Sequence, residues 1–267
     1  MSSKENSDDL TKLIAGATDA KSPYTGGHCA RVPKVAEMLV DAACKAEEGP
    51  FADFRMDTKD QRWEFEVAAW LHDGGKVTTP EYVVDKATKL ETIYNRIHEI
   101  RMRFEVLLRD AKIATYQKRL AGDVDEFLLE AQLAKEKKQI SDDFAFVAAC
   151  NIDGEFMVDE KIERLEQIAI RTWTRHLDDR IGISNDEAVL KNNTLAPTLP
   201  VIEQVLADKP EHIIPRTNSK PFDDNPHGFK MDIPENQYNL GELYNLGIRK
   251  GTLSPEDRFK INEHTII

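Results

Sequence analysis

The chain has 267 residues, 40% of them hydrophobic and 31% charged. This length is enough for a buried core, and this composition excludes a disordered chain. Its 36 Lys and Arg residues are outnumbered by 48 Asp and Glu residues, and the net charge of −12 argues against nucleic acid or an anionic membrane as a partner. No stretch approaches the ~18 consecutive apolar residues of a membrane span. Residues 1–9 lack the apolar run of a signal peptide, so we expect a cytoplasmic protein.

The three cysteines do not predict a structural framework. Cys29, Cys44 and Cys150 are odd in number, and none belongs to a C-x-x-C pair. We therefore predict neither disulfide bonds nor a cysteine-ligated zinc site.

The first ninety residues predict helices separated by turns. Apolar residues recur at helical spacing over residues 8–20 and again over residues 32–43. Pro33 is acceptable in the second helix only if it lies in the first turn. A further helix is predicted over residues 63–73, and Gly74-Gly75 should end it.

Residues 90–183 predict long helices packed as a hairpin or a small bundle. A stripe of apolar residues alternates spacings of three and four: Leu90, Ile93, Ile97, Ile100, Phe104 and Leu107. A sustained parallel coiled coil is the weaker alternative, because this stripe lasts only about three heptads.

Seven of the 12 prolines lie in residues 197–234, which predicts a long irregular connection. Helical signals resume near residue 240, and Ser254-Pro255-Glu256-Asp257 is typical of a helix start. No strand-like alternation stands out. The predicted fold class is therefore all-α.

The clearest chemical feature is the run WLHDGGK at residues 70–76. A histidine and an aspartate side by side at a helix end can reach one metal ion, and glycines leave room for ligands. Taken without its context, the His-Asp pair is better interpreted as a capped helix end with a core histidine. His28 adds weight to the metal hypothesis, because it lies four residues before Val32 and is expected to point toward the same core.

Two segments carry a resemblance to a known family. Residues 19–32, DAKSPYTGGHCARV, resemble the opening of HD-GYP domains, D-x-(x-x)-Y-T-x-x-H-x-x-R-V. Residues 69–77, AWLHDGGKV, followed by Pro80 and Lys86, resemble the H-D-x-G-K segment of that family. The resemblance covers roughly residues 8–90 and resumes near residue 245.

The resemblance implies an HD-type helical bundle that holds divalent metal ions, Fe or Mn by expectation, two of them in a complete domain. It implies a phosphodiesterase of signal transduction that hydrolyses a cyclic dinucleotide, chiefly cyclic di-GMP. Members with three metals have a glutamate four residues before the first histidine, and Tyr24 at that position favours two metals.

Carried over residue by residue, the resemblance makes His28, His72 and Asp73 metal ligands. It gives Asp73 and Lys76 catalytic roles, with Lys76 and Arg31 contacting the substrate phosphate.

The next family ligand follows a K-x-G-x-L-(S/T)-x-E-E pattern, and two places fit. Residues 86–91 lead to His98, and residues 250–257 lead to His264. His264 is the better match, because the glycine, the Ser-Pro cap and the acidic pair are all present. Other histidines carry weaker expectations: His176 is packed or partly exposed on an amphipathic helix, and His212 and His227 lie in the proline-rich segment, where a surface loop is expected.

The expected organisation follows from this order of motifs. Residues 8–89 form the first part of the HD core, 90–196 a helical insertion, 197–238 the proline-rich connection and 239–267 the returning core helices. The family's paired histidine and glutamate, its Gly-Tyr-Pro turn and its last aspartate do not occur, so we expect an incomplete domain and site. The alternative function is a catalytically incompetent signalling module that docks a protein partner through the helical insertion.

Overall fold

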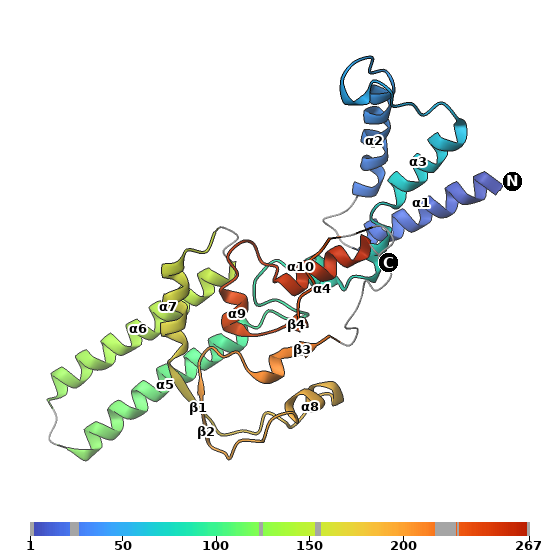
Figure 1. The fold of residues 1–267 in the computed structure, drawn as a ribbon. Helices are drawn as coiled ribbons and strands as arrows, with labels where there is room; N and C mark the ends of the chain where they lie inside the picture. Colours follow the sequence, from blue (N-terminus) through green and yellow to red (C-terminus); the bar gives the residue numbers. More distant parts are fainter. Residues whose placement is uncertain are drawn as a thin grey trace. The chain divides into compact units, whose positions relative to one another are not determined.

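The computed structural model describes residues 3–21, 27–122, 125–152, 156–216, 228 and 230–265, with side chains from residue 7 onward. The chain is mostly helical, with 62% of it in helices, and its described residues form ten α-helices and four short strands. Figure 1 shows their order along the chain. The predicted mostly helical character is confirmed, whereas the strands were not expected.

The chain divides into two compact units. Met1–Asp85 and Arg258–Ile267 form unit 1, and Lys86–Asp257 form unit 2. Segments from the two ends of the sequence therefore share unit 1, and the long middle segment folds on itself. Among the described helices, none is both long enough and apolar enough to cross a bilayer.

Unit 1 is built from short helical segments. These are α1 (Ser3–Lys21), α2 (His28–Cys44), η1 (Gly49–Phe51), α3 (Lys59–Leu71), η2 (Gly74–Thr78), α4 (Glu81–Val84), the end of α10 (Pro255–Asn262) and η4 (Glu263–Thr265). Thr58 and Gln61 cap the start of α3 reciprocally. The indole of Trp63 donates to Asp8 at 2.8 Å, which ties α3 to α1.

The apolar face expected on α2 is only partly buried. Val40 is buried, whereas Val35 and Leu39 are 55% and 66% exposed. Pro33 is buried inside the helix as its sixth residue, so the expected first-turn position is wrong. Pro33 has no N–H to donate to the carbonyl of Cys29, and this end of α2 is held by contacts outside the helix instead.

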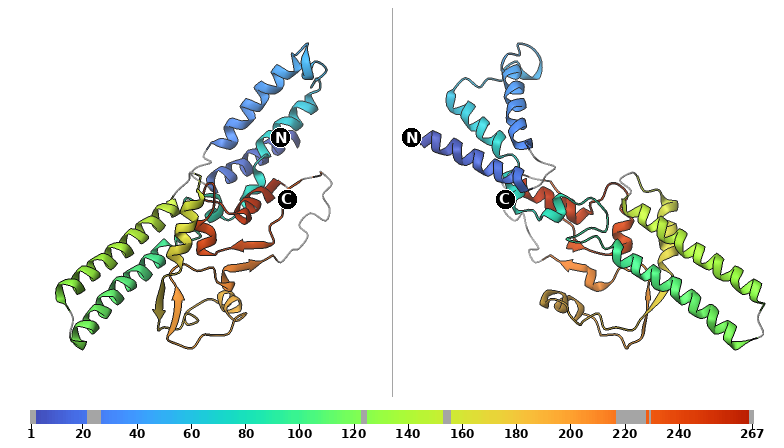
Figure 2. Two further views of the ribbon diagram at one scale, coloured as in Figure 1. Left: turned by 60° about the vertical axis from the view of Figure 1, so that its left-hand side comes forward. Right: turned by 180° about the vertical axis from the view of Figure 1, so that it is seen from behind.

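Unit 2 contains the main hydrophobic core. The helices α5 (Ile97–Ala121) and α6 (Glu126–Ile152) run side by side as an antiparallel hairpin, visible in Figure 1 and from two further sides in Figure 2. The α5 stripe buries Phe104 and Leu107 against α6, where the ring of Phe144 lies 5.5 Å from that of Phe104. The helix α7 (Asp159–Ala169) adds Leu165 to this core.

The helical prediction for residues 90–183 is too long at both ends. The helix α5 begins at Ile97, and Ile93 is 90% exposed. After Ala169 the chain forms β1 (Thr172–Arg175), which pairs antiparallel with β2 (Val201–Gln204). The β-branched and aromatic residues of β1 favour a strand, but their partner strand lies some thirty residues later, where a local pattern does not reveal it.

The proline-rich segment is more ordered than expected over its described part. It contains β2, η3 (Pro210–His212) and β3 (Ile213–Pro215), which pairs antiparallel with β4 (Asn236–Asn239). Just before this segment, the helix α8 (Asn185–Lys191) begins with a capping box between Ser184 and Glu187. Residues 217–227 and 229 lie outside the described residues.

Two buried lysines at the beginning of unit 2, Lys86 and Lys89, hold the last residues of the same unit. The ammonium of Lys89 donates to the carbonyls of Leu246 and Ile248 at 3.0 and 2.9 Å, just beyond the end of α9 (Glu242–Leu246). Lys86 forms a 2.7 Å ion pair with Asp257. The Asp257 carboxylate also accepts from the backbone of Ser254, so the predicted helix start at residues 254–257 is confirmed.

Candidate metal centre

Asp19 positions the start of α2 and with it His28. Its carboxylate accepts the backbone N–H groups of Gly27 at 3.0 Å and Cys29 at 3.2 Å. Both donors stand at the N-terminus of α2, where N–H groups have no partner within the helix. Gly27 has φ of 74°, a left-handed conformation that glycine adopts without strain. The sequence motif includes Asp19, but no role was predicted for it.

His72 and His264 are held with the same ring nitrogen turned away from the site. His72 donates from Nδ1 to the carbonyl of Ala69 at 2.8 Å, and Nδ1 of His264 bonds in the same way to the carbonyl of Ile261. In both rings this bond places the proton on Nδ1 and leaves the Nε2 lone pair available. Backbone carbonyls orient metal-binding histidines in this manner.

The side chains of His28, His72 and Asp73 converge in unit 1, as the sequence predicts. Nε2 of each histidine lies 3.3 Å from Oδ2 of Asp73, and the two Nε2 atoms lie 3.2 Å apart. Metal bonds of ~2.0–2.2 Å at tetrahedral or octahedral angles separate neighbouring ligand atoms by about 2.8–3.6 Å. The three atoms therefore have the spacing of ligands around one ion. Their role as ligands stays a prediction.

His264 faces the second oxygen of the same carboxylate. Its Nε2 lies 3.6 Å from Oδ1 of Asp73, and its side chain is 8% exposed. Of the two histidines considered from the sequence, His264 is thus the one placed beside Asp73 within unit 1. His98 belongs to α5 of unit 2, where it contacts Arg101 and lies against the ring of Tyr94.

Of the basic side chains around Asp73, Lys76 forms the closest ion pair with its carboxylate. Its ammonium lies 2.8 Å from Oδ2 of Asp73. Burial raises the pKa of Asp73, but the hydrogen bond and positive charge of Lys76, helped by His72 and His28, outweigh burial and leave that pKa below its usual value. Asp73 is thus a carboxylate at neutral pH, which is the form that binds metal.

The remaining candidates differ in their surroundings. Arg31 lies on α2 one turn beyond His28 and is exposed. Burial, followed by a hydrogen bond with Asp19, raises the pKa of the Cys29 thiol to about 11, so without a bound metal this thiol is protonated at neutral pH. His176 follows the strand β1 and is exposed, so its predicted place on an amphipathic helix is wrong. Tyr24 and His227 lie outside the described residues.

Gly75 is needed for His264 to approach the site. A methyl group at Gly75 would collide with the carbonyl oxygen of His264 and lie 3.1 Å from its Cβ. We expect Gly75→Ala to cost about 1–3 kcal/mol of stability and to lower Mn²⁺ affinity about tenfold by displacing His264. Urea unfolding and calorimetric titration measure the two effects.

Gly16→Ala is the matched control for this substitution. Nothing lies within 4 Å of a Cβ at Gly16, which is inside α1, so alanine there should stabilise by about 0.5–1 kcal/mol. Equal behaviour of the two variants would contradict the placement of His264 against Gly75.

Comparison of the chain with protein-family models, with curated proteins and with solved structures finds no match.

Proposed function

We propose that unit 1 is a metal-dependent phosphodiesterase centre of the HD-GYP kind, on an HD-type helical bundle. The observation that carries the proposal is the convergence of His28, His72 and His264 on the two oxygens of Asp73. Oδ2 has two imidazoles beside it, and Oδ1 has one. Asp73, His28 and His72 would hold one cation at Oδ2, and His264 could add a donor for a second cation at Oδ1.

The donor set suits a first-row divalent ion. Two imidazole nitrogens and a carboxylate oxygen favour Fe, Mn, Zn or Ni over Ca or Mg. A divalent ion at this place would supply Lewis-acid polarisation of a phosphodiester and would make an attacking water more acidic. We propose Fe or Mn, in line with the motif resemblance.

Lys76 would serve the phosphate. Its ammonium now contacts Oδ2 of Asp73, and a cation at that oxygen would compete with it by charge repulsion. The ammonium of Lys76 would then be available to a phosphate oxygen, where it would offset the negative charge that develops during hydrolysis. Arg31, exposed one turn beyond His28, would be a second contact for the phosphate.

The proposed substrate is a cyclic dinucleotide, and this choice rests on the motif resemblance of residues 19–32 and 69–77. Four donor side chains are few for two six-coordinate ions. We therefore expect the 267-residue chain to hydrolyse cyclic di-GMP slowly.

The test is hydrolysis of cyclic di-GMP by the Mn²⁺-loaded chain. We expect slow product formation above a metal-only blank, absent in Asp73→Ala and lowered at least about tenfold in Lys76→Met. Lys76→Met should still bind Mn²⁺, which separates loss of phosphate contact from loss of metal. Bound Mn²⁺ without any cleavage would contradict the phosphodiesterase proposal.

The alternative is a signalling module that docks a protein partner through the helical hairpin. The observation that favours it is the apolar surface near the end of the hairpin, where Leu120 and Phe127 are 87% and 84% exposed. The two proposals differ in metal content. A purified chain that holds no Fe or Mn and binds neither on addition would favour the docking module.

A further inference from the structure

Unit 2 contains a cavity of about 460 Å³ between α5 and the β1–β2 ribbon. The cavity is within the size range of sites for small organic molecules. One face of α5 forms a wall with Glu99, Met102, Arg103 and Val106, which are spaced by three and four residues. Met102 is 61% exposed, so the cavity opens to solvent along α5.

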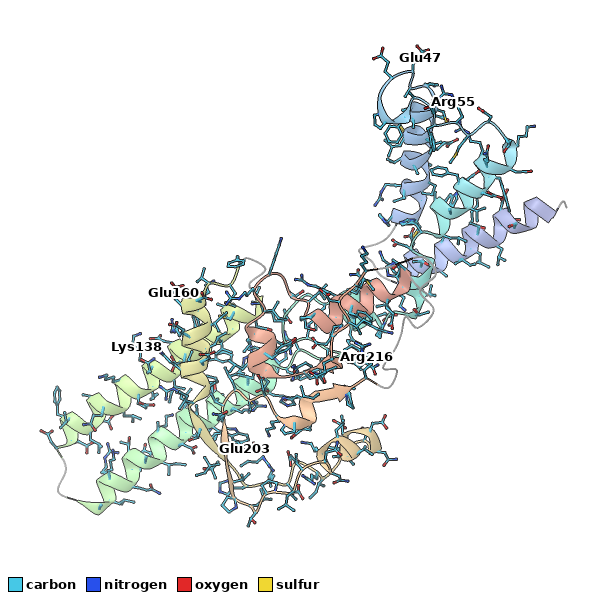
Figure 3. All side chains as sticks on the ribbon, in the orientation of Figure 1. Glu47, Arg55, Lys138, Glu160, Glu203 and Arg216 are labelled. Carbon is cyan, nitrogen blue, oxygen red and sulfur yellow. The ribbon has the colours of Figure 1, made fainter. Side chains whose placement is uncertain are left out.

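The β1–β2 ribbon turns Trp173 and its charged side chains, Arg175 and Glu203, toward this cavity. Trp173 lies opposite Glu203 in the register of β1 and β2, and Arg175 follows on the same face. Figure 3 labels Glu203 on the ribbon. Arg175 is only 9% exposed, whereas Ile202 on the opposite face is 70% exposed. A ribbon that served only to cover a hydrophobic core would show the reverse pattern.

The four basic side chains of the lining are already paired. Arg103 contacts Glu242 at 2.7 Å, and Lys191 contacts Asp179 at 2.8 Å. Glu203 accepts from both Arg175 and Lys209, at 3.1 and 3.0 Å.

The lining has one net negative charge, because five acidic residues face the four basic ones. Burial lowers the pKa of His212, which keeps this lining imidazole neutral. The pocket therefore offers no surplus cation, and an anion such as a phosphate is a poor fit.

Two hydrogen-bond donors in this wall lack an acceptor. Nε1 of Trp173 and Nε of Arg175 are buried and have no hydrogen-bond partner within the described part of the chain. They stand two residues apart on one face of β1. Buried N–H groups are rarely left unpaired, because burial without a partner costs the full desolvation of the group. A bound molecule that offers acceptor oxygens to both would satisfy them.

We propose that this cavity binds a zwitterionic α-amino acid with an apolar side chain. The carboxylate would accept from the indole of Trp173 and the guanidinium of Arg175. The ammonium would face the surplus of acidic residues, and the side chain would lie along Val106 and Met102. This site belongs to unit 2 and does not depend on the function proposed for unit 1.

The test follows the indole N–H signals of the full chain by NMR. The sequence has three tryptophans, Trp63, Trp70 and Trp173, and loss of one signal in Trp173→Phe assigns the reporter. Should that variant not fold, Trp63→Phe and Trp70→Phe assign it by elimination. On addition of L-phenylalanine or L-methionine, we expect the Trp173 signal to move downfield as its N–H gains an acceptor, while the other two stay in place.

Matched probes separate the two ends of the zwitterion. L-phenylalaninamide lacks the carboxylate and 3-phenylpropionate lacks the ammonium, and each should bind at least about tenfold more weakly than L-phenylalanine. Trp173→Phe keeps an aromatic ring but loses the donor, so its affinity should also fall about tenfold, whereas Trp70→Phe should bind normally.

Two results would overturn the proposal. One is an unmoved Trp173 signal with both amino acids at millimolar concentration. The other is a Trp173 signal that responds to adenosine but to neither amino acid, which would assign the cavity to a nucleobase instead.

Discussion

Replacing Asp73 by alanine is expected to lower the affinity for Mn²⁺ by about 100-fold or more. The two oxygens of Asp73 face all three imidazoles of the cluster, at 3.3, 3.3 and 3.6 Å. Asp73 is also the carboxylate in the three-residue group whose ligand atoms lie within 4.8 Å of one another. Substitution of residues that only orient metal ligands changes metal affinity by 10–100-fold. Loss of Asp73, the carboxylate that faces all three imidazoles, should lower the affinity by more than that. Calorimetric titration of the metal-free chain measures it.

Asp41→Ala is the control for this experiment. Asp41 also belongs to unit 1 and pairs with an arginine, Arg62, but both side chains are well exposed, at 47% and 38%. Mn²⁺ affinity should not change in this variant. An Asp73→Ala chain that bound Mn²⁺ within about threefold of the native chain would show that the ion, if bound, sits elsewhere.

Replacing Lys86 by methionine is expected to cost about 3–5 kcal/mol of stability, because removal of one partner leaves the other charge buried and unpaired. The side chains of Lys86 and Asp257 are 5% and 10% exposed, and their charged atoms are 2.7 Å apart. The pair joins the first residues of unit 2 to its last. Urea unfolding of the full chain, followed by circular dichroism, measures the loss.

Two variants check that the cost arises from the buried charge. Lys138→Ala removes a lysine of an exposed pair with Asp142, on the surface of α6 in Figure 3, and should cost no more than about 1 kcal/mol. The double variant Lys86→Met with Asp257→Asn removes both charges and keeps an oxygen that can accept from Ser254, so it should recover part of the loss. A Lys86→Met cost equal to that of Lys138→Ala would contradict this account.

The helices of the candidate site could be predicted because their signals are local. The Gly74-Gly75 pair follows the last turn of α3 within a few residues, and the Ser254–Asp257 capping box marks the start of α10. The apolar stripe of α5 is buried from Ile97 onward, as its spacing indicated. The convergence of His28 with His72 and Asp73 was predicted from helix faces and from the motif resemblance together.

The parts that were missed depend on residues distant in sequence. The strand β1 owes its conformation to pairing with β2. Leu90 is buried in the core although it precedes α5, and its N–H donates to the side-chain oxygen of Asn151. Asp19 acts by capping a helix that starts nine residues later, at His28. The cavity of unit 2 combines side chains from α5, β1, β2 and the segments around α8 and η3, and no single stretch of sequence carries its signature.

The most direct test of the metal centre is pulsed electron paramagnetic resonance of the chain loaded with Mn²⁺. Nitrogen atoms of bound imidazoles give a characteristic ¹⁴N coupling, and we expect this coupling in the native chain. It should weaken in His28→Ala and in His72→Ala and stay unchanged in His98→Ala, whose histidine contacts Arg101 on α5. A spectrum of hydrated Mn²⁺ without nitrogen coupling in the native chain would show that His28 and His72 do not hold the ion.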